Sequence, residues 1–319
     1  MKNIIHIADF YSTEIRGGGE LVDSIVVDSL VGRGYSVERI KSKDVTEEFI
    51  KNNAEKTFIV SNFVMLNPTC LRLLQTCDYV IYEHDHKYIV GRDPSPYKDY
   101  KVPADQLTNL EFYRNAKAVF AQSKLHAEVI SKNIREANVI SLGCSLWSDE
   151  ELDVLQKYVD TEKNGKMAVL NSTNQIKGTH QAKTFCEKNG IDYNLIVSLD
   201  YNNFINQLSQ HTGLVFFSQV LETFCRLAVE ARIVNCKLRS NNNLFFAIDD
   251  WFPKYKGQEL LDFVRSQKTK VIDKVVEVLE SEKTNEFVTA PITVILNAYR
   301  RPYNLRMQID AIRKQTTRP

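Results

Sequence analysis

The segment Gly213-Leu-Val-Phe-Phe-Ser-Gln219 is a short, mainly apolar run, and Leu221-Glu-Thr-Phe-Cys-Arg-Leu-Ala-Val-Glu-Ala-Arg232 follows it. Such a run is typical of a strand buried on both faces, as in a parallel sheet. The residues after it predict a loop and then a helix, which places them at the carboxyl end of the strand. Open α/β sheets bind ligands at that edge. This stretch therefore predicts an α/β fold and a ligand site together.

Charged residues are evenly spaced in the second part of this stretch. Glu222, Arg226 and Glu230 follow one another at intervals of four. Positions i, i+4 and i+8 of a helix share a face, so the spacing alone is typical of a solvated ladder of ion pairs. The residues between them are mostly apolar, however, and leave little of the helix for water. A charged stripe on a mostly buried helix needs a partner or a ligand.

The stretch from Glu222 to Arg232 resembles the paired-glutamate motif of the family 4 glycosyltransferases. These are retaining enzymes with the two-domain GT-B fold. The resemblance implies that Glu230 binds the ribose hydroxyls of a nucleotide-sugar donor and that Glu222 lies against the transferred sugar. Carboxylates accept hydrogen bonds from neighbouring hydroxyls, which suits both roles.

The same resemblance assigns the donor diphosphate to the backbone between the two glutamates, including Thr223 and Phe224. Free N–H groups and the positive dipole end at a helix N-terminus favour phosphate. The family often has glycine near Cys225 and Arg226. Its absence here implies that the Arg226 side chain supplies part of the phosphate contact.

Two further motifs agree with the resemblance. Gly17, Gly18 and Gly19 follow a predicted strand at residues 3–8. Alone they are typical of a flexible turn, but they resemble the glycines that let the family 4 backbone approach the donor diphosphate or the acceptor. Lys177-Gly178 follows a predicted strand at 166–171 and resembles the lysine that binds donor phosphate. The arginine that usually precedes this lysine is replaced by serine and threonine at 172–173.

A histidine pair follows the predicted strand at residues 78–83. His84-Asp85-His86 has a spacing that metal sites use, but no third ligand group with regular spacing accompanies it. A histidine that caps the strand end is the simpler interpretation. The resemblance implies that His84 lines the cleft near the reacting sugar, and His86 is the weaker candidate. We predict no metal.

Composition bounds the class of protein. The chain has 319 residues, a net charge of +1 and six cysteines, at positions 70, 77, 144, 186, 225 and 236. This length predicts two domains. The charge gives no global attraction to nucleic acid, although it does not exclude a local basic patch. The cysteines show no paired metal spacing, and we expect reduced thiols in a cytoplasmic protein. No signal peptide or membrane-spanning run is predicted, which leaves peripheral membrane contact open.

Strands and helices alternate along the chain, so we predict two Rossmann-like, doubly wound parallel-sheet domains that face each other across a cleft, the GT-B fold. The acceptor-side domain is predicted at residues 1–146 and the nucleotide-sugar domain at 147–288. Residues 289–319 resemble the opening strand and helix of a family 2, GT-A glycosyltransferase. This segment implies a truncated or vestigial second module, or a C-terminal fusion.

The expected function is retaining transfer of a hexose or pentose from a UDP-, GDP- or ADP-sugar to a hydroxyl acceptor, with a glycan as the default acceptor. The predicted catalytic residues are Glu222, His84 and Lys177. The predicted donor-binding residues are Gly17, Gly18, Gly19, Lys177, Thr223, Phe224, Arg226 and Glu230. No cofactor besides the donor is expected. An epimerase or phosphorylase of the same fold, or a nucleotide-binding protein without activity, stays as the alternative.

Overall fold

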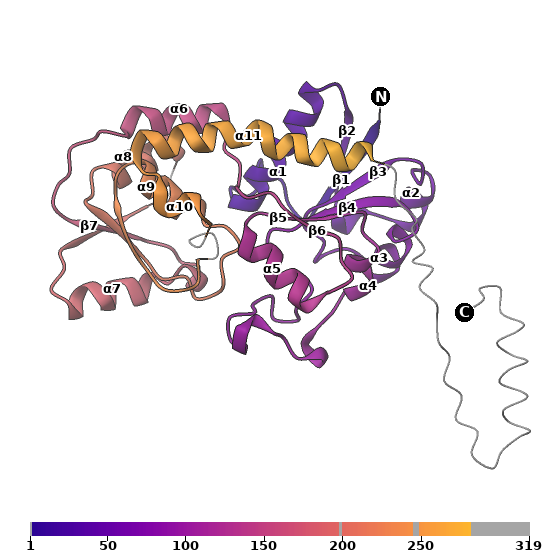
Figure 1. Ribbon diagram of the computed structural model, residues 1–319, viewed down its shortest axis with the longest axis horizontal. Helices are drawn as coiled ribbons and strands as arrows, with labels where there is room; N and C mark the ends of the chain where they lie inside the picture. Colours follow the sequence, from indigo (N-terminus) through magenta and orange to yellow (C-terminus); the bar gives the residue numbers. More distant parts are fainter. Residues whose placement is uncertain (1, 198–199, 245–248, 282–319) are drawn as a thin grey trace, which may run out of the picture. The chain divides into compact units, whose positions relative to one another are not determined.

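The structure is a computed structural model and describes residues 2–197, 200–244 and 249–281 (Figure 1). These residues belong to one compact unit that ends at Ser281. The predicted GT-A-like segment at 289–319, with the fusion that it implies, lies outside the described residues. The predicted boundary between residues 146 and 147 stays a prediction.

The first half of the unit is built on a parallel sheet. Within the described residues its strands are ordered β2-β1-β3-β4-β5-β6, and every neighbouring pair is parallel. The strands are β1 Asn3–Ala8, β2 Ser36–Lys41, β3 Thr57–Val60, β4 Asp78–Tyr82, β5 Val119–Ala121 and β6 Val139–Ser141. The central strands are buried on both faces, as their apolar runs predict.

Helices cover both faces of this sheet. The helices of the first half are α1 Gly18–Gly32, α2 Glu47–Lys51, α3 Pro68–Leu74, α4 Leu110–Arg114 and α5 Lys124–Asn133, with short 3-10 turns η1 Ser42–Asp44, η2 Lys98–Tyr100 and η3 Ala104–Gln106. Helix α1 packs on the face of the sheet that carries the side chains of Ile4 and Val80. Helices α2 to α5 pack on the other face, which carries those of Ile5 and Ile81. Ser123 caps α5 and accepts a hydrogen bond from the backbone N–H of His126.

The second half repeats this plan on a smaller sheet. Its strands are ordered β10-β9-β7-β8, and all are parallel. The elements are α6 Asp149–Tyr158, β7 Met167–Leu170, η4 Gln175–Lys177, α7 Thr179–Lys188, β8 Tyr193–Ile196, α8 Tyr201–Ser209, β9 Gly213–Phe216, α9 Arg226–Ile233, β10 Lys237–Ser240, α10 Trp251–Lys254 and α11 Gly257–Glu280. Helix α7 covers one face, and α8 and α9 cover the other.

The strand order of the second sheet places a crevice at its carboxyl edge. Strand β7 lies between β9 and β8, so the chain leaves β7 toward one side of the sheet and leaves β9 toward the other. The loops after these two strands therefore diverge. Open α/β sheets bind ligands at such a switch point.

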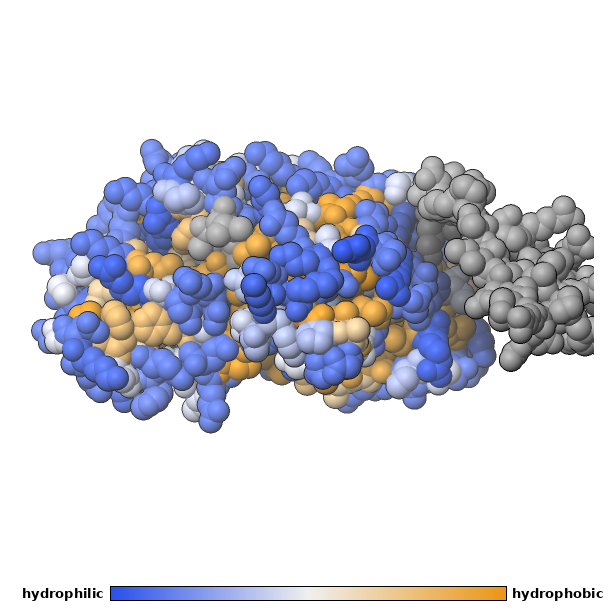
Figure 2. Space-filling view, turned by 60° about the horizontal axis from the view of Figure 1, so that its bottom comes forward, coloured by the Kyte–Doolittle hydropathy of each residue, from blue (hydrophilic) through white to orange (hydrophobic). Residues whose placement is uncertain are grey.

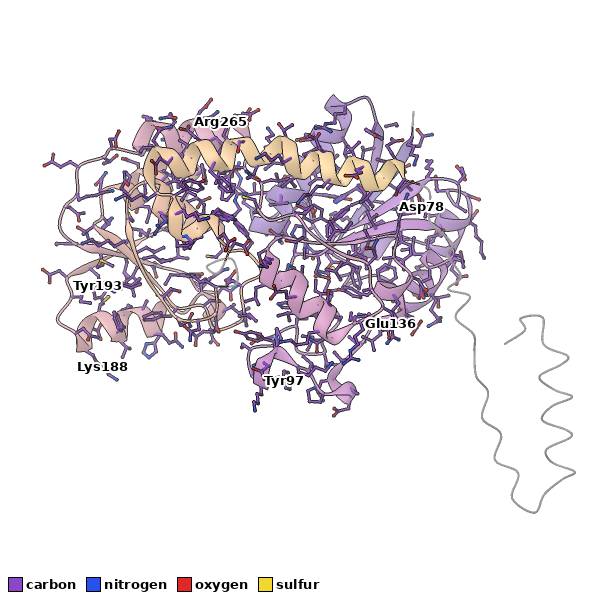
Figure 3. All side chains as sticks on the ribbon, in the orientation of Figure 1. Asp78, Tyr97, Glu136, Lys188, Tyr193 and Arg265 are labelled. Atoms are coloured by element: carbon purple, nitrogen blue, oxygen red, sulfur yellow. The ribbon has the colours of Figure 1, made fainter. Side chains whose placement is uncertain are left out.

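One apolar cluster joins the two halves. It runs from Val22 of α1 through the fully buried Trp147 to Ala228 of α9, and it continues along α11 to Leu279. Helix α11 returns from the second half to the first, as Figure 1 shows in orange to yellow, and it packs against α9, α6 and α1. Arg265 of α11 points toward α6, where its Nη2 lies 3.3 Å from an Asp153 carboxylate oxygen (Figure 3).

The predicted α/β class with parallel sheets is confirmed, because the strands predicted at residues 3–8, 78–83, 166–171 and 213–219 coincide with β1, β4, β7 and β9. One prediction about the central stretch is wrong. Glu222 lies ahead of α9, which begins at Arg226, so only Arg226 and Glu230 share a helix face. None of the helices in the described part of the chain is long and apolar enough to cross a membrane. The face in Figure 2 is mainly hydrophilic, with hydrophobic areas between polar ones.

Candidate functional site

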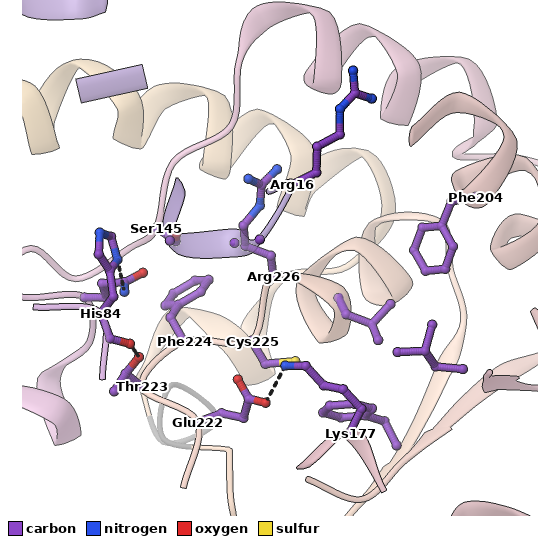
Figure 4. Close-up of a pocket in the computed structure, with 17 residues that line it drawn as sticks. Arg16, His84, Ser145, Lys177, Phe204, Glu222, Thr223, Phe224, Cys225 and Arg226 are labelled. Atoms are coloured by element: carbon purple, nitrogen blue, oxygen red, sulfur yellow. Dashed lines mark hydrogen bonds and ion pairs between the residues drawn. The ribbon is translucent and has the colours of Figure 1, made fainter. Parts of the chain in front are cut away.

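A cavity of about 380 Å³ lies where the carboxyl ends of the two sheets meet (Figure 4). From the first half it is lined by Arg16, Gly17, Gly18, Gly19, His84, Gln122 and Ser145, and from the second half by Leu170, Lys177, Phe204, Phe216, Glu222, Thr223, Phe224, Cys225, Arg226 and Leu227. The structure thus brings together all the predicted site residues except Glu230. The volume lies in the range of small-molecule sites.

The start of α1 forms one wall of the cavity. Gly17 is the residue before the helix, in an extended conformation, and no side chain caps this helix end. A side chain at Gly19 would meet the His84 ring, since an added Cβ would lie 3.2 Å from its nearest atom. None of the glycines at 17–19 has a positive φ angle, so we attribute the use of Gly17 and Gly19 to close approach rather than to backbone conformation.

The opposite wall carries an ion pair. Lys177 Nζ lies 3.0 Å from Glu222 Oε1, and that oxygen also accepts a hydrogen bond of 3.2 Å from the Ser218 hydroxyl. Burial lowers the pKa of Lys177, but the Glu222 carboxylate outweighs this effect and the net pKa is raised. Lys177 is therefore a stable cation at the cavity.

Gly178 places Lys177 by allowing two loops to touch. Its φ is +64°, in the left-handed region, and an added Cβ would lie 1.9 Å from the Phe217 carbonyl oxygen. The backbone N–H of Gln219 donates to the Ile176 carbonyl at 2.8 Å, which ties the loop after β9 to the loop after β7. A residue with a side chain at position 178 is incompatible with this contact.

The loop that carries Glu222 is held on both sides. The Glu222 N–H donates to the Asn243 carbonyl at 2.8 Å within an isolated parallel bridge to Leu244. The Thr223 hydroxyl donates to the His84 carbonyl at 2.7 Å, and the Ser123 hydroxyl donates to the Thr223 carbonyl at 3.1 Å. These two bonds link the second half directly to the first at the cavity.

The aromatic ring of Phe224 fills the space behind this loop. It lies edge-on to Trp147 and stacks with Trp251, at centroid distances of 6.1 and 6.2 Å. The neighbouring thiol of Cys225 is buried, and burial raises its pKa, so it stays protonated. Phe224 and Cys225 thus contribute packing and backbone to the cavity.

His84 is held at both ring nitrogens. Its Nε2 lies 2.7 Å from an Asp23 carboxylate oxygen, and its Nδ1 lies 3.1 Å from the Gln122 amide nitrogen. Because a carboxylate only accepts hydrogen bonds, Nε2 of His84 is the donor to Asp23. Burial would raise the pKa of Asp23, but His84 and His6 outweigh it, and the net pKa lies well below its usual range. Asp23 is therefore an anion that orients His84.

Arg226 is compensated by two carboxylates. Its Nη2 lies 2.5 Å from Glu151 Oε1 and its Nε lies 3.6 Å from Glu230 Oε1, while the guanidinium stacks 5.0 Å above the Trp147 ring. Burial lowers the pKa of Arg226, but Glu151 and Glu230 outweigh it and raise the net value. Nη1 is buried and has no hydrogen-bond partner within the described ranges.

Glu230 lies behind the cavity wall and is 5% exposed. Its Oε1 accepts hydrogen bonds from Trp147 Nε1 at 2.9 Å and from the Tyr201 hydroxyl at 3.1 Å, besides the contact with Arg226. Burial raises the pKa of Glu230, and Arg226 and Trp147 oppose that shift. The predicted role of Glu230 toward ribose stays a prediction.

Several residues of this site carry no signal in the sequence. Asp23 and Gln122 hold His84, and Trp147, Tyr201 and Glu151 hold the Arg226–Glu230 pair. Glu151 is recognisable only as part of a capping box, since its Oε2 accepts from the Ser148 N–H. Its other oxygen reaches Arg226, 75 residues away. Only the fold brings these residues together.

The His84-Asp85-His86 spacing does not produce a ligand cluster. His86 is fully buried, and its Nδ1 lies 3.1 Å from the Tyr88 hydroxyl, whereas His84 faces the cavity. Within residues 2–197, 200–244 and 249–281, no group of three or more His, Cys, Asp or Glu side chains is arranged to hold a metal ion.

Sequence comparison finds no protein-family model that matches the chain and no matching curated protein. Solved structures do match. HepE of Anabaena in complex with UDP and glucose superimposes with a TM-score of 0.52 at 12% identity, over 88% of this chain and 100% of that chain. An α-glucosyltransferase in complex with UDP and a 13-mer DNA containing an HMU base has a TM-score of 0.49 at 12% identity, over 87% and 94%. The pneumococcal O-GlcNAc transferase GtfA in complex with UDP and GlcNAc has a TM-score of 0.45 at 10% identity, over 73% and 60%.

The chain has the GT-B fold. This follows from the likeness to HepE over almost the whole described unit, together with two parallel sheets whose carboxyl ends meet at one cavity. The predicted fold class is confirmed at this level.

Proposed function

We propose that the protein is a retaining glycosyltransferase of the family 4 type, which transfers a hexose or pentose from a nucleoside-diphosphate sugar to a hydroxyl group. In this proposal two Rossmann-like domains meet near residue 147, the first for the acceptor and the second for the donor. The observation that carries the proposal is the convergence of three positive elements on one cavity. These are the start of α1, the start of α9 and the ammonium of Lys177, and neither helix start has a side-chain cap.

This convergence suits a diphosphate. Uncapped helix starts offer free N–H groups and a positive dipole end, and the Lys177 cation adds a full charge. When the bond between sugar and diphosphate breaks, negative charge grows on the diphosphate, and fixed donors stabilise that charge without reorganising. Protein groups thus supply the positive charge, so we propose a reaction that is independent of metal.

Arg226 has a different part in this proposal. Its charge is already balanced by Glu151 and Glu230. We therefore assign the diphosphate mainly to Lys177 and the backbone, and we assign Arg226 to holding Glu230. The hydrogen bonds and ion pair described for Glu230 all go to Oε1. Its Oε2 is the oxygen that we assign to the ribose hydroxyls.

The transferred sugar is assigned to the space between Glu222 and His84. Glu222 is held by Lys177 and Ser218 and faces the cavity, so its carboxylate can accept hydrogen bonds from sugar hydroxyls. His84 is fixed at both ring nitrogens, and we assign it to shaping the reacting face. In the retaining mechanism that we propose, the leaving diphosphate takes the proton of the acceptor hydroxyl.

Donor binding is the first test. UDP-glucose, UDP-galactose, UDP-N-acetylglucosamine, GDP-mannose and ADP-glucose are titrated into the folded protein by calorimetry. We expect a UDP-sugar to bind, because HepE, which shares the fold, is in complex with UDP and glucose. Lys177→Met should weaken binding, whereas Lys188→Met, at the far end of α7, is the matched control (Figure 3). Absence of binding to every donor, or equal loss in both variants, would contradict the proposal.

The reaction is tested separately by following donor consumption with and without acceptors. Consumption that requires a hydroxyl acceptor supports transfer, and the anomeric coupling constant of the product distinguishes retention from inversion. Conversion of the donor without acceptor would instead indicate an epimerase, and dependence on inorganic phosphate would indicate a phosphorylase. Binding without any consumption would indicate a nucleotide-binding protein that lacks activity.

A further inference from the structure

A groove outside the cavity is lined by more cationic than acidic side chains. It runs along α5 and is lined by Lys101, Lys124, Lys132 and Arg135, all exposed, with Glu128 as its one acidic residue. In the described part of the chain, none of these four cations takes part in an ion pair, whereas Arg33, Arg39 and Arg114 each lie within 3 Å of a carboxylate oxygen. The chain as a whole is nearly neutral, at +1, so this charge is local.

The sequence alone suggests a different arrangement. Glu128 is four residues from both Lys124 and Lys132, the spacing at which helical ion pairs form. In the structure Lys132 turns away, and its Nζ donates to the Asp99 carbonyl at 2.8 Å. Lys101 Nζ in turn donates to the Lys132 carbonyl at 2.7 Å. Both ammonium groups are therefore placed along the groove by carbonyls, which leave their charge uncompensated.

The turn that precedes Lys101 is strained and is held against α5. Asp99 and Tyr100 have φ angles of +52° and +58°, which cost about 1 kcal/mol or more for each residue with a side chain. Asn133 holds this turn, because its Nδ2 donates to the Tyr100 carbonyl and its Oδ1 accepts from the Val102 N–H, both at 2.9 Å. The backbone on both sides of Lys101 is thus tied to α5.

We propose that this groove binds the phosphodiester backbone of a nucleic acid. Helix α5 has 10 residues and is about 15 Å long, which matches about four successive phosphates of one strand. None of the exposed large hydrophobic side chains among the described residues lines the groove, and a surface that inserts into a bilayer would need them. Because no aromatic side chain lines the groove, we expect it to contact the phosphates of the backbone without recognising the base sequence. The proposal does not depend on the transfer reaction.

The test uses the full chain and a fluorescein-labelled 20-base-pair DNA duplex, with binding followed by anisotropy between 50 and 200 mM NaCl. The variant is Lys124→Gln with Arg135→Gln, because neither side chain makes a hydrogen bond or an ion pair within the described ranges. Each lost phosphate contact should reduce the salt slope by about 0.9 and weaken binding roughly tenfold near 0.1 M salt. The unfolding temperature should stay unchanged.

A second double variant separates the groove from net charge. Lys51→Gln with Lys56→Gln removes the same formal charge elsewhere, at lysines that lie 3.6 and 3.4 Å from Glu47 and Glu38. We expect its salt slope to equal that of the unmodified protein. Three results would overturn the proposal: no duplex binding at 50 mM NaCl, equal loss in both double variants, or binding of phosphatidylserine vesicles through Lys124 and Arg135 without binding of the duplex.

Discussion

Replacing Gly178 by alanine isolates the contact between the two loops of the candidate site. Gly178 and Gly190 lie at opposite ends of α7, with similar φ angles of +64° and +60°. An added Cβ at Gly190 meets nothing within 4 Å, whereas at Gly178 it lies 1.9 Å from the Phe217 carbonyl oxygen. Gly190→Ala therefore measures backbone strain alone, and Gly178→Ala measures the same strain plus a collision.

The magnitudes follow from these two terms. Left-handed backbone costs alanine about 1–2 kcal/mol, partly offset by about 0.4–1 kcal/mol from a stiffer unfolded chain, so Gly190→Ala should lose about 1 kcal/mol. Relieving the collision requires the Phe217 carbonyl to move by about 1 Å. Displacements of this kind in packed regions cost about 1–3 kcal/mol more. We expect Gly178→Ala to lose about 2–4 kcal/mol in total.

Urea denaturation of both variants gives the difference in free energy of unfolding. Calorimetric titration with the best donor gives a second readout, because the displaced loop carries Ser218 and Glu222 and the strained residue follows Lys177. Gly178→Ala should weaken donor binding, and Gly190→Ala should leave it unchanged. Equal losses of stability, or unaltered donor binding in Gly178→Ala, would refute the reasoning.

Three further perturbations test other parts of the site. Lys177→Met removes the cation 3.0 Å from Glu222, and donor affinity measured by calorimetry should fall about 10- to 100-fold, the worth of a charged hydrogen bond; an unchanged affinity would exclude Lys177 from the donor site. Trp147→Phe removes the Nε1–H that donates to Glu230 at 2.9 Å, and urea denaturation should show a loss of about 1–3 kcal/mol; a loss below 0.5 kcal/mol, roughly the smallest net worth of a hydrogen bond, would mean that water replaces the donor. Burial raises the pKa of Asp249 to about 6, above its unfolded value, so the stability that this group contributes is present at low pH and is lost as pH rises through 6. The free energy of unfolding of Asp249→Asn, taken relative to that of the unmodified protein, should therefore be about 1 kcal/mol higher at pH 7.5 than at pH 5. A difference between the two proteins that does not change with pH would contradict this.

The sequence by itself determined the α/β class and most element positions, because those depend on local patterns. An apolar run such as Gly213–Phe216 indicates a strand buried on both faces, and Ser123 caps the following helix by accepting from the N–H of His126, three residues on. The residues that follow the carboxyl ends of strands were identified from their order in the sequence together with the family resemblance. The motifs at Gly17, Lys177 and Glu222 do line one cavity.

Only the tertiary structure decided which charges meet. Glu222 and Glu230 belong to the same sequence motif, and the sequence does not distinguish their surroundings. In the structure Glu222 faces the cavity and Glu230 is buried behind its wall, because α9 begins between them, at Arg226. The nearer of the two carboxylates that pair with Arg226 is that of Glu151, which belongs to the helix that connects the two sheets. Pairings across such distances depend on the packing of α6 against the second half, and no local pattern encodes them. The charge of the groove along α5 has the same origin. Lys132 is spaced for a helical ion pair with Glu128, but it donates instead to the Asp99 carbonyl, which the fold brings close to it.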